Sequence, residues 1–397
     1  MNKQFAGCMG AVALALASSV AWGQEPFKIG LMTTLSGPGA AIGTEVRDGF
    51  ELGVKHADGK LGGIETTVTV VDDQQKPMEG RQAVERLIKR DKVDVITGMV
   101  FSNVLLPVMP TILGSDTVYI SANTGPADYA GERCNPNFFA VSWQNEDIPA
   151  AMGKYVTDKA HKKVYLIAPN YPGGRESIEG FKRTFKGDIA DEVYVKLGQV
   201  DFAAELAQMR ASGADSVFFF LPGGMGVAFI KQLVNSGLSS QMAVYTPGFS
   251  ADQDTIAAIG DSMKGMANAA QWSPDLDNAA NQRFVKDFQQ AYGRLPSMYA
   301  AQGYDAARLL DGALKADPKA AQDREALRQA LRKAPFESVR GAFAFNNNQY
   351  PIQTYYMREV APNAQGQMSN KIVSTVFEQF HDHFAPQCKM DSNKKGA

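Results

Sequence analysis

Short apolar runs alternate with amphipathic, helix-length stretches from the start of the chain. The first apolar run, residues 27–33, reads FKIGLMT, and a stretch with helical spacing of apolar positions follows from about Thr44 to Asp58. Further apolar runs lie at 66–74, 93–100 and 117–123, and further helical stretches lie at 77–91, from Ser102, and at 125–131. This order predicts βαβ units, which form a parallel sheet with helices on both faces.

The alternation starts again after residues 137–149, a segment that we expect to leave the first sheet. Helices are expected at 150–159, 173–185, 202–213 and 226–237, and strands at 163–169, 192–197, 216–222 and 242–248. The pattern therefore predicts a second sheet from about Ser142 onward.

The last third of the chain follows a different pattern. Residues 265–278 are polar and rich in turn formers, and they break the alternation. The helices predicted next, 281–293 and 297–317, have no strands of their own, so we assign them to the first lobe. Residues 343–361 and 370–380 alternate like antiparallel strands and fit the edge of the second sheet.

The predicted fold class is α/β, with two Rossmann-like lobes joined by a hinge of three chain crossings and a ligand cleft between the lobes. A chain of 397 residues is too long for one ordinary core and suits two domains. The crossings are expected near Trp143, Trp272 and Phe343, and a turn is expected at Asn346 to Gln349. The first lobe is predicted to comprise 24–142 and 273–342, and the second lobe 143–272 and 343–397.

Charge and the N-terminal segment indicate an exported protein. The formal net charge is −2 and no long basic block occurs, so neither nucleic acid nor an anionic membrane surface is an expected partner. Residues 1–23 combine Lys3, a short apolar run and Ala21-Trp22-Gly23, which indicates a cleavable signal peptide and periplasmic localisation. A membrane anchor is the alternative, but the apolar run is short for a bilayer span. Cys8 precedes that run, whereas a lipid-bearing cysteine follows it.

Two cysteines, Cys134 and Cys388, remain after the signal peptide. An oxidising compartment favours a disulfide between them, and two separate buried thiols are the alternative. Neither has neighbours at metal-ligand spacing, so zinc is not expected.

Motifs for cofactors and catalysis are incomplete. The loop from Gly37 to Gly43 has the spacing G-x-G-x-x-x-G, which departs from the dinucleotide fingerprint, and no phosphate-binding G-x-x-x-x-G-K-[ST] occurs. No serine or cysteine stands beside a recognisable base. The pair His381 and His383 is a weak metal candidate, for which a solvated tail is the simpler interpretation. We therefore expect no enzyme activity, no cofactor and no metal.

Polar and aromatic residues gather after the predicted strands, where open parallel sheets bind ligands. In the two lobes these segments are Ser36 to Ile42, Phe101 to Asn103, Ser121 to Gly125, Asn170 to Tyr171, Leu221 to Gly224, and Thr246 to Phe249. Two such edges facing each other across a hinge form a cleft. Ser102 and Thr124 stand where helices begin, so each either caps its helix or contacts a ligand, and the two roles are compatible.

Several of these segments resemble the branched-chain amino-acid binding proteins, which are Leu/Ile/Val-binding-like type I periplasmic solute receptors of ABC importers. The similar segments are IGLMTTLSGPGAAIG, VDDQQKPMEGRQAVERLI, GFSADQDTI and YDAARLLDGAL, and their order covers nearly all of the mature chain. The resemblance implies hinge closure on a solute and delivery to a membrane permease. It also implies ligand contacts at the matching positions Ile42, Ser102, Asn123, Thr124, Tyr171, Leu221 and Gly248.

Two departures from that family disfavour an α-amino acid. Amino-acid receptors place an acid in the late loop of the second lobe, where this chain has Thr246 to Phe249, and an acid near the first crossing is replaced by Asn145. Glu146 and Asp147 leave the second alignment open. A buried ammonium group without a counter-charge is costly.

The predicted ligand is a flat aromatic carboxylate. The expected ligand contacts combine apolar and aromatic residues with hydroxyl and amide donors. They are Ile42, Phe101, Ser102, Asn123, Thr124, Gly125, Tyr171, Leu221, Gly248, Phe249 and Trp272. Segments CNPNFF, SPDLDN and GRLPSMYAAQGYDAA resemble the subgroup that takes up aromatic acids, such as benzoate or hydroxycinnamate derivatives from lignin breakdown. Arg175 is either a counter-charge for the ligand or a solvated helix residue.

Three alternatives remain open at this stage. A branched-chain or aliphatic amino acid or an amide is the other ligand class. An enzyme on the same architecture and a sensory receptor are further functions. We expect a monomer.

Overall fold

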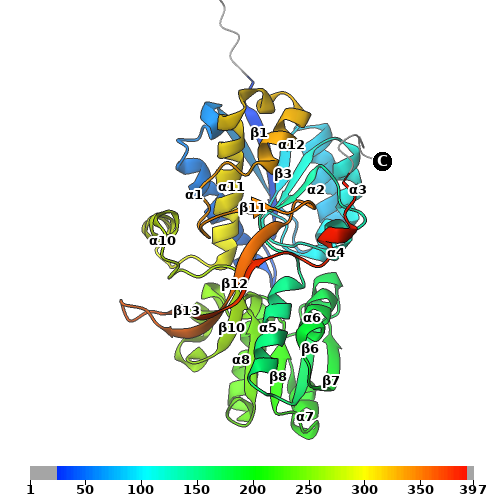
Figure 1. Ribbon diagram of the computed structural model, residues 1–397, viewed down its shortest axis with the longest axis vertical. Helices are drawn as coiled ribbons and strands as arrows, with labels where there is room; N and C mark the ends of the chain where they lie inside the picture. The colour runs from blue at the N-terminus through cyan, green and yellow to red at the C-terminus, as the bar shows by residue number, and fades with distance from the viewer. Residues whose placement is uncertain (1–24, 391–397) are drawn as a thin grey trace, which may run out of the picture.

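The computed structural model describes residues 25–390, and the predicted signal peptide at 1–23 lies outside the described residues. Two lobes, each built on its own sheet, stand one above the other in Figure 1. The first sheet has the order β2-β1-β3-β4-β5 with all neighbours parallel. Its strands are β1 (Phe27–Thr33), β2 (Thr66–Asp72), β3 (Val95–Thr97), β4 (Val118–Ser121) and β5 (Phe138–Ala140), and the helices between them are α1 (Ala40–Lys55), α2 (Pro77–Lys89), α3 (Ser102–Gly114) and α4 (Ala127–Ala130).

The second sheet has the order β11-β12-β10-β9-β8-β6-β7, with β13 paired to β12. Strands β6 to β10 are parallel, and β11, β12 and β13 pair antiparallel at the edge, which confirms the predicted α/β class with an antiparallel border. The strands are β6 (Lys163–Pro169), β7 (Asp188–Val195), β8 (Ser216–Phe219), β9 (Ala243–Pro247), β10 (Ala267–Ala270), β11 (Ala344–Phe345), β12 (Pro351–Pro362) and β13 (Met368–Phe380). The helices are α5 (Asp147–Asp158), α6 (Pro172–Thr184), α7 (Ala203–Ala211), α8 (Gly224–Asn235) and α9 (Gln253–Ile259).

Strand β10 is a correction to the sequence pattern, which predicts no strand within 265–278. Its sequence ANAA has little intrinsic strand preference. The strand forms because β9 and β12 pair with it on both sides and because Asn268 hydrogen-bonds two buried partners. Its Nδ2 donates to Asn370 Oδ1 over 2.7 Å, and its Oδ1 accepts from Arg358 Nε over 2.9 Å. Tertiary pairing therefore overrides local propensity.

Helix α11 (Met298–Ala316) packs lengthwise on α1, as expected for an element of the first lobe (Figure 1). The two backbones approach closely because glycines face them. A Cβ atom added at Gly49 would lie 1.9 Å from the carbonyl oxygen of Ala300, and one at Gly303 would lie 2.1 Å from that of Val46. Two further helices, α10 (Ala279–Tyr292) and α12 (Arg324–Arg332), lie on either side of α11 in the sequence. Short 3-10 turns occur along the whole described chain, at Leu61–Gly63, Leu238–Ser240, Gly248–Ser250, Gly260–Met263, Pro318–Ala321 and Ala385–Gln387.

A buried arginine ties the hinge segments together. The guanidinium group of Arg340 pairs with Asp305 of α11 at 3.1 Å and donates to the Gln353 side chain of β12 over 2.6 Å. It also donates to the carbonyl oxygen of Ser142, at the first chain crossing, over 3.3 Å. Three segments that are far apart in sequence thus share one guanidinium group whose side chain is 4% exposed.

The chain returns to the first lobe after β13, which differs from the expectation that 343–397 belong to the second lobe. Figure 1 shows the segment that follows β13, in red, beside α4. Cys388 forms a disulfide with Cys134, with the two Cα atoms 5.6 Å apart. The turn before β12 also contacts the first lobe, because Tyr350 donates its hydroxyl to the Pro126 carbonyl oxygen over 2.8 Å and Ala140 N donates to Gln349 O over 3.0 Å. The tail and this turn therefore pack on the first lobe.

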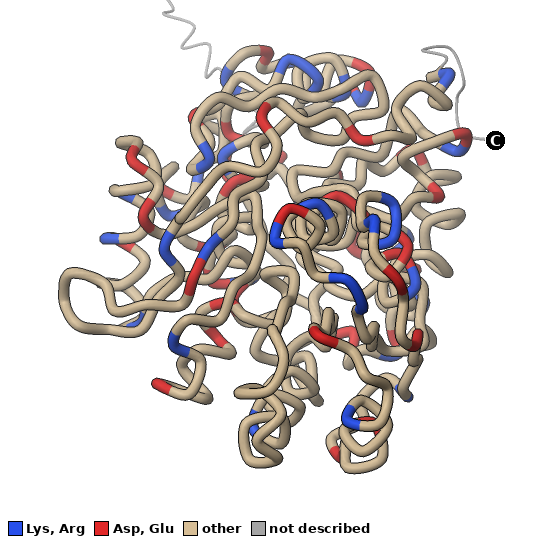
Figure 2. Tube along the Cα trace, turned by 60° about the horizontal axis from the view of Figure 1, so that its bottom comes forward, with Lys and Arg blue, Asp and Glu red and all other residues tan. Residues whose placement is uncertain are grey.

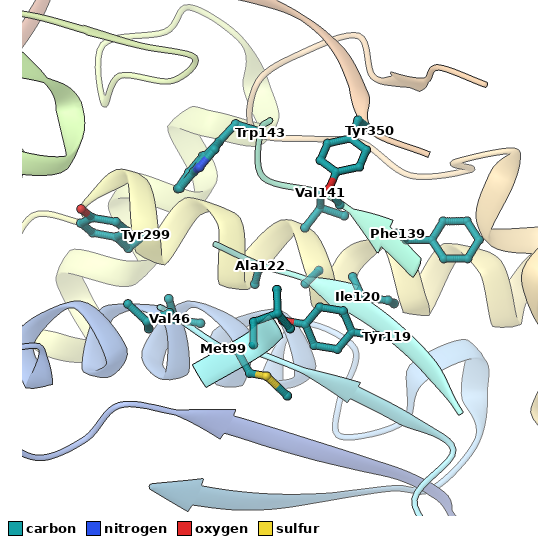
Figure 3. Close-up of a cluster of buried hydrophobic side chains, with 14 of the residues drawn as sticks. Val46, Met99, Tyr119, Ile120, Ala122, Phe139, Val141, Trp143, Tyr299 and Tyr350 are labelled. Atoms are coloured by element: carbon teal, nitrogen blue, oxygen red, sulfur yellow. The ribbon is translucent and has the colours of Figure 1, made fainter. Parts of the chain in front are cut away.

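The core of the first lobe extends to its junction with the second lobe. Figure 3 shows part of it, with Ile120 and Phe139 from the sheet near α11, and with Trp143 and Tyr299 at one end of the cluster. Both of these aromatic residues are almost fully buried. None of the helices in the described part of the chain combines the length and the apolar character that a membrane crossing requires.

Candidate functional site

A small cavity of about 30 Å³ lies between the two lobes, near the carboxyl ends of their parallel strands. This position is where open α/β sheets bind ligands. Among the described residues, those that line the cavity are all uncharged: Ile42, Val100, Phe101, Ser102, Asn123, Thr124, Trp143, Asn145, Tyr171, Gly173, Phe220, Pro222, Phe249 and Tyr299.

One group of lining residues is polar. The hydroxyl oxygens of Ser102 and Thr124 lie 2.5 Å apart, so one of these groups donates a hydrogen bond to the other. Asn145 Nδ2 lies 3.4 Å from the Ser102 oxygen and 3.3 Å from the Thr124 oxygen. Asn123 also lines the cavity and donates from Nδ2 to the Val100 carbonyl oxygen over 2.6 Å, while its buried Oδ1 has no partner among the described residues. The site thus offers uncharged donors together with one free acceptor.

Ser102 and Thr124 do not cap helices, which removes one of the two roles considered for them. The N-cap of α3 is Phe101 and the N-cap of α4 is Pro126, and neither cap makes a side-chain hydrogen bond. Ser102 is instead the first residue of α3. Both hydroxyl groups are therefore directed to each other and to Asn145, at the cavity.

Five aromatic rings form a continuous wall around the cavity. Neighbouring ring centroids are separated by 6.2 Å for Phe101 and Tyr171, 6.3 Å for Tyr171 and Phe220, 5.4 Å for Phe220 and Phe249, and 4.9 Å for Phe249 and Trp143. These spacings are those of interacting aromatic pairs. Phe101 comes from the first lobe, Trp143 from the first crossing and the other three from the second lobe, so the wall is complete only when the lobes meet.

The glycine-rich loop before α1 supports this wall. A Cβ atom at Gly39 would lie 2.5 Å from the ring of Phe101, so only a glycine allows the loop to pass so close. The next residue toward the N-terminus, Pro38, accepts a hydrogen bond at its carbonyl oxygen from Gly224 N of the second lobe over 3.3 Å. The loop therefore lies against the aromatic wall and touches the opposite lobe.

Seven of the predicted contact residues line the cavity: Ile42, Phe101, Ser102, Asn123, Thr124, Tyr171 and Phe249. The other four predicted contacts lie elsewhere. Gly125 is behind Asn145, and its N–H donates to Asn145 Oδ1 over 2.8 Å. Gly248 packs under the cavity, since a Cβ there would lie 2.7 Å from the buried Arg358 side chain.

Leu221 and Trp272 are also outside the lining. Leu221 points into the second core cluster, on the far face of the second sheet, because side chains alternate along an extended chain, and Phe220 and Pro222 line the cavity in its place. Trp272 lies at the second crossing, where its Nε1 donates to Asn281 Oδ1 over 2.7 Å and its ring packs against Phe284. The tryptophan that lines the cavity is Trp143.

Trp143, Phe220, Val100 and Gly173 are lining residues that the sequence does not single out as contacts. A signal for Phe220 exists, since it is the neighbour of the predicted Leu221 in the same run. In the sequence, Asn145 stands out only as the replacement for an acid. The structure places it at the centre of the polar group.

A partly buried acid lies behind Asn145. Glu176 of α6 accepts hydrogen bonds from Asn145 Nδ2 over 2.5 Å and from Ala127 N over 2.8 Å. Burial raises the pKa of its carboxyl group to about 7, although both hydrogen bonds act in the opposite direction. Glu176 does not line the cavity, and Asn145 separates it from the two hydroxyl groups.

Basic residues and metal ligands are not part of the described site. The exposed Arg175 donates to Asn170 Oδ1 over 2.7 Å, as expected for a helix residue at the surface. Within residues 25–390 no cluster of three or more His, Cys, Asp or Glu side chains has an arrangement that would hold a metal ion. Burial lowers the pKa of His383 to about 4, and its ring lies against Phe384. Figure 2 shows acidic and basic residues interspersed along both lobes.

Comparisons with known proteins agree with the fold. The family model described as periplasmic binding protein matches residues 26–367. A solute-binding protein of an ABC transporter from R. palustris, solved in complex with benzoate, is 32% identical with a TM-score of 0.87, and the match covers 92% of this chain and all of that chain (100%).

Two further relatives carry different ligand names. A solute-binding protein of an ABC transporter from Rhodopseudomonas palustris BisB5, in complex with 3,4-dihydroxy benzoic acid, is 27% identical with a TM-score of 0.83, covering 91% of this chain and 99% of that chain. The Leu/Ile/Val-binding protein homolog 6 of Brucella melitensis is 24% identical over 377 residues, covering 92% of this chain and 95% of the relative. The relatives therefore include both aromatic-acid complexes and a protein named for aliphatic amino acids.

Proposed function

Because the chain belongs to the periplasmic binding protein family and is a solute-binding protein of an ABC transporter, we propose that its cargo is a small aromatic carboxylate of the benzoate or hydroxycinnamate type. The observation that carries this proposal is the wall of five rings around a cavity lined by uncharged groups. Aromatic faces and edges on several sides favour a planar ring. In this proposal Tyr171 and Phe249 close over the ring of the ligand.

The polar end of the cavity suits the carboxylate of such a ligand. The Ser102 and Thr124 hydroxyls form one hydrogen bond between them, which leaves a second hydroxyl hydrogen for the ligand. Ser102 is also the first residue of α3, a helix of 13 residues, so the backbone N–H groups of its first turn point toward the same place. Unpaired N–H groups and the helix dipole favour an anion there.

A carboxylate held in this way needs no arginine or lysine. Hydrogen bonds from uncharged groups to a charged group are each worth roughly 1.5 to 3 kcal/mol net, so two or three of them hold a small anion. The two solved relatives with benzoate and 3,4-dihydroxy benzoic acid support this ligand class for the chain. The free Oδ1 of Asn123 suits a ligand that also carries a hydroxyl group.

A branched-chain or aliphatic amino acid, or an amide, is the second candidate. The name of the Brucella melitensis relative favours it. Glu176 is the carboxylate that would serve as the counter-charge of an ammonium group. However, Asn145 stands between Glu176 and the cavity. An ammonium group there would be desolvated without direct contact to its counter-charge, which is unfavourable.

The wider function follows from the same proposal. The protein is a periplasmic binding protein, and we propose that a cleaved signal peptide at residues 1–23 takes it to the periplasm as a monomer. There it closes on an aromatic acid, such as those released from lignin, and delivers it to its ABC permease. No enzymatic step is part of the proposal.

Isothermal titration of the purified protein, unfolded and refolded to remove any ligand retained from the cell, tests the ligand class. The panel comprises benzoate, 4-hydroxybenzoate and 4-hydroxycinnamate against leucine, isoleucine and valine, with benzamide as the uncharged counterpart of benzoate. We expect one equivalent of an aromatic acid to bind, benzamide to bind more weakly, and the amino acids not to bind. Tight binding of leucine together with no binding of any aromatic acid would overturn the proposal.

A further inference from the structure

Glu176 connects three parts of the molecule that meet when the lobes are closed. It belongs to α6 of the second lobe, but one of its carboxyl oxygens accepts from Ala127 N of α4 in the first lobe. The other oxygen accepts from Asn145 at the first chain crossing. Through Asn145 it is one side chain away from the Ser102 and Thr124 hydroxyls.

The charged groups that face Glu176 from the surrounding elements are acidic or already paired. Glu146, at the start of α5, and Asp128, on α4, both raise its pKa, in addition to the effect of burial. Arg183 is engaged by Glu146, and Arg133 pairs with Asp128 at 3.1 Å. The remaining titratable neighbours are the tyrosines: Glu176 raises the pKa values of Tyr171, which precedes α6, and of Tyr350, in the turn before β12.

No ion pair to Glu176 occurs in the described part of the chain. The carboxylate is held only by an amide side chain and a backbone N–H. A carboxyl group in these surroundings exchanges a proton within the neutral pH range, since its pKa is about 7. Its protonation state is therefore sensitive to any further charge placed nearby.

We propose that Glu176 is a specificity-determining residue, and that its carboxylate takes up a proton from solvent when an anionic ligand binds to Ser102 and Thr124. This proposal rests on the proposed function. Asn145 Nδ2 lies 2.5 Å from Glu176 and 3.3 Å from the Thr124 oxygen, so one amide group separates the two negative charges. Like charges at this separation disfavour each other's ionised form, and the proton removes the repulsion.

The direction of proton exchange distinguishes the two ligand classes. A carboxylate favours the protonated form of Glu176, so the proton is taken up from the buffer and no other bond changes. An ammonium group beside Asn145 favours the ionised form, so a proton is released instead. Glu176 thus favours carboxylates at neutral and acidic pH, and it weakens their binding as the pH rises.

Titration calorimetry with benzoate measures this exchange directly. The observed enthalpy is measured at pH 7 in buffers with different ionisation enthalpies, and the slope gives the number of protons taken up. With Glu176 close to half protonated in the free protein, we expect uptake of about half a proton at pH 7 and almost none at pH 5. The Kd for benzoate is expected to rise between pH 7 and pH 9, by at most about tenfold per pH unit.

Glu176→Gln assigns the effect to this residue. We expect this variant to bind benzoate with no proton uptake and with a Kd that is constant from pH 6 to pH 9. Glu179→Gln is the matched control, because Glu179 is on the same helix, is exposed and loses the same charge. Asp254→Asn is a second control, because burial also raises the pKa of Asp254 to about 7. Both control variants are expected to keep the uptake of the unmodified protein.

Three outcomes would overturn the inference. The first is benzoate binding without proton uptake at pH 7, and the second is proton release on binding. The third is an uptake that persists in Glu176→Gln, or that disappears in either control variant. If Glu176→Gln does not fold, the carboxyl carbons of ¹³C-glutamate-labelled protein are titrated by NMR with and without benzoate. A single glutamate with a pKa near 7 must then shift upward on binding. Failure of every aromatic carboxylate to bind refutes the proposed function itself and is distinct from these results.

Discussion

Replacing Thr124 by valine removes one hydroxyl group from the polar end of the cavity and keeps nearly the same shape. The Thr124 hydroxyl contacts the Ser102 hydroxyl at 2.5 Å and Asn145 Nδ2 at 3.3 Å, and its side chain lines the cavity. Its backbone carbonyl oxygen still accepts from Ser121 Oγ over 2.6 Å. The substitution therefore alters the donor set without removing the bond that shapes this segment.

The magnitude follows from the count of hydroxyl hydrogens. In the pair, one hydrogen is used between the two hydroxyls and one remains for the ligand. After Thr124→Val the Ser102 hydrogen becomes free to take over, so the loss should lie near the lower limit for a hydrogen bond to a charged group. That limit is about 1.5 kcal/mol, or roughly tenfold in Kd. Adding Ser102→Ala removes the second donor as well, and we expect a loss of about 3 kcal/mol or more, which is over a hundredfold.

The Kd for benzoate, measured by calorimetry at pH 6.5, checks both values. Thr97→Val is the matched control, because Thr97 is a buried threonine of β3 whose hydroxyl donates to the Ile120 carbonyl oxygen over 2.7 Å, outside the cavity lining. This control should lose about 1 kcal/mol of unfolding free energy and keep its Kd. An unchanged Kd in the Thr124→Val and Ser102→Ala double variant, with the fold intact, would refute the assignment of these hydroxyls to the ligand.

Three further predictions concern stability. Replacing Cys134 and Cys388 by serine opens a loop with a sequence separation of 254. We expect the free energy of unfolding, measured in urea, to fall by roughly 5 kcal/mol, and we expect reductant to have no effect on the variant. Equal stability of the variant and the unmodified protein would contradict this. Arg340→Met leaves the Asp305 carboxylate buried without its partner, so the free energy of unfolding should fall by about 3 to 5 kcal/mol. A fall of less than about 1 kcal/mol would show that the pair contributes nothing. Burial raises the pKa of Asp254 to about 7, above its value in the unfolded chain, so the folded state binds more protons between pH 4 and pH 7. The unfolding free energy should therefore fall as the pH rises through this window, and Asp254→Asn, measured at pH 4.5 and pH 7.5, should lack this contribution. Identical pH profiles of the variant and the unmodified protein would disprove it.

Much of the fold can be predicted from the sequence because most central strands are buried on both faces. Such strands are short, apolar and separated by amphipathic helices, and this pattern is unambiguous for the strands β1, β3, β4, β6, β8 and β9. Strand β10 shows where the rule fails. Its residues are small and include Asn268, so its stability comes from the pairing of β9 and β12 and from the buried Arg358, none of which is local in sequence.

The candidate site is predictable as a region and less so as individual side chains. The ends of the strands are visible in the sequence, and they identify Ser102, Thr124 and Tyr171. Successive side chains of an extended segment point to opposite faces, so a prediction that is off by one residue selects the wrong face. For this reason the sequence predicts Leu221 as a contact, whereas Phe220 lines the cavity. Trp143 and Trp272 both lie at chain crossings, and only the packing of Trp272 on α10 removes it from the site.

Glu176 could not be recognised from the sequence for a related reason. On α6 alone it is an ordinary polar residue of an amphipathic helix, next to the exposed Arg175. It is partly shielded from solvent because α4 and the first crossing of the chain contact it. Burial that is created between two lobes leaves no periodic signal in either one.

The geometry makes ligand binding and lobe closure a single event. The ring wall takes residues from both lobes and the first crossing, and Asn145 in that crossing joins the Ser102 and Thr124 donors of the first lobe to Glu176 of the second. A ligand that engages these donors therefore gains its full set of contacts only in the closed form. Such differential affinity is what shifts a hinge equilibrium, because a ligand that binds two conformations equally shifts neither. The bound anion in turn favours the protonated form of Glu176, so the proton and the anion are captured together.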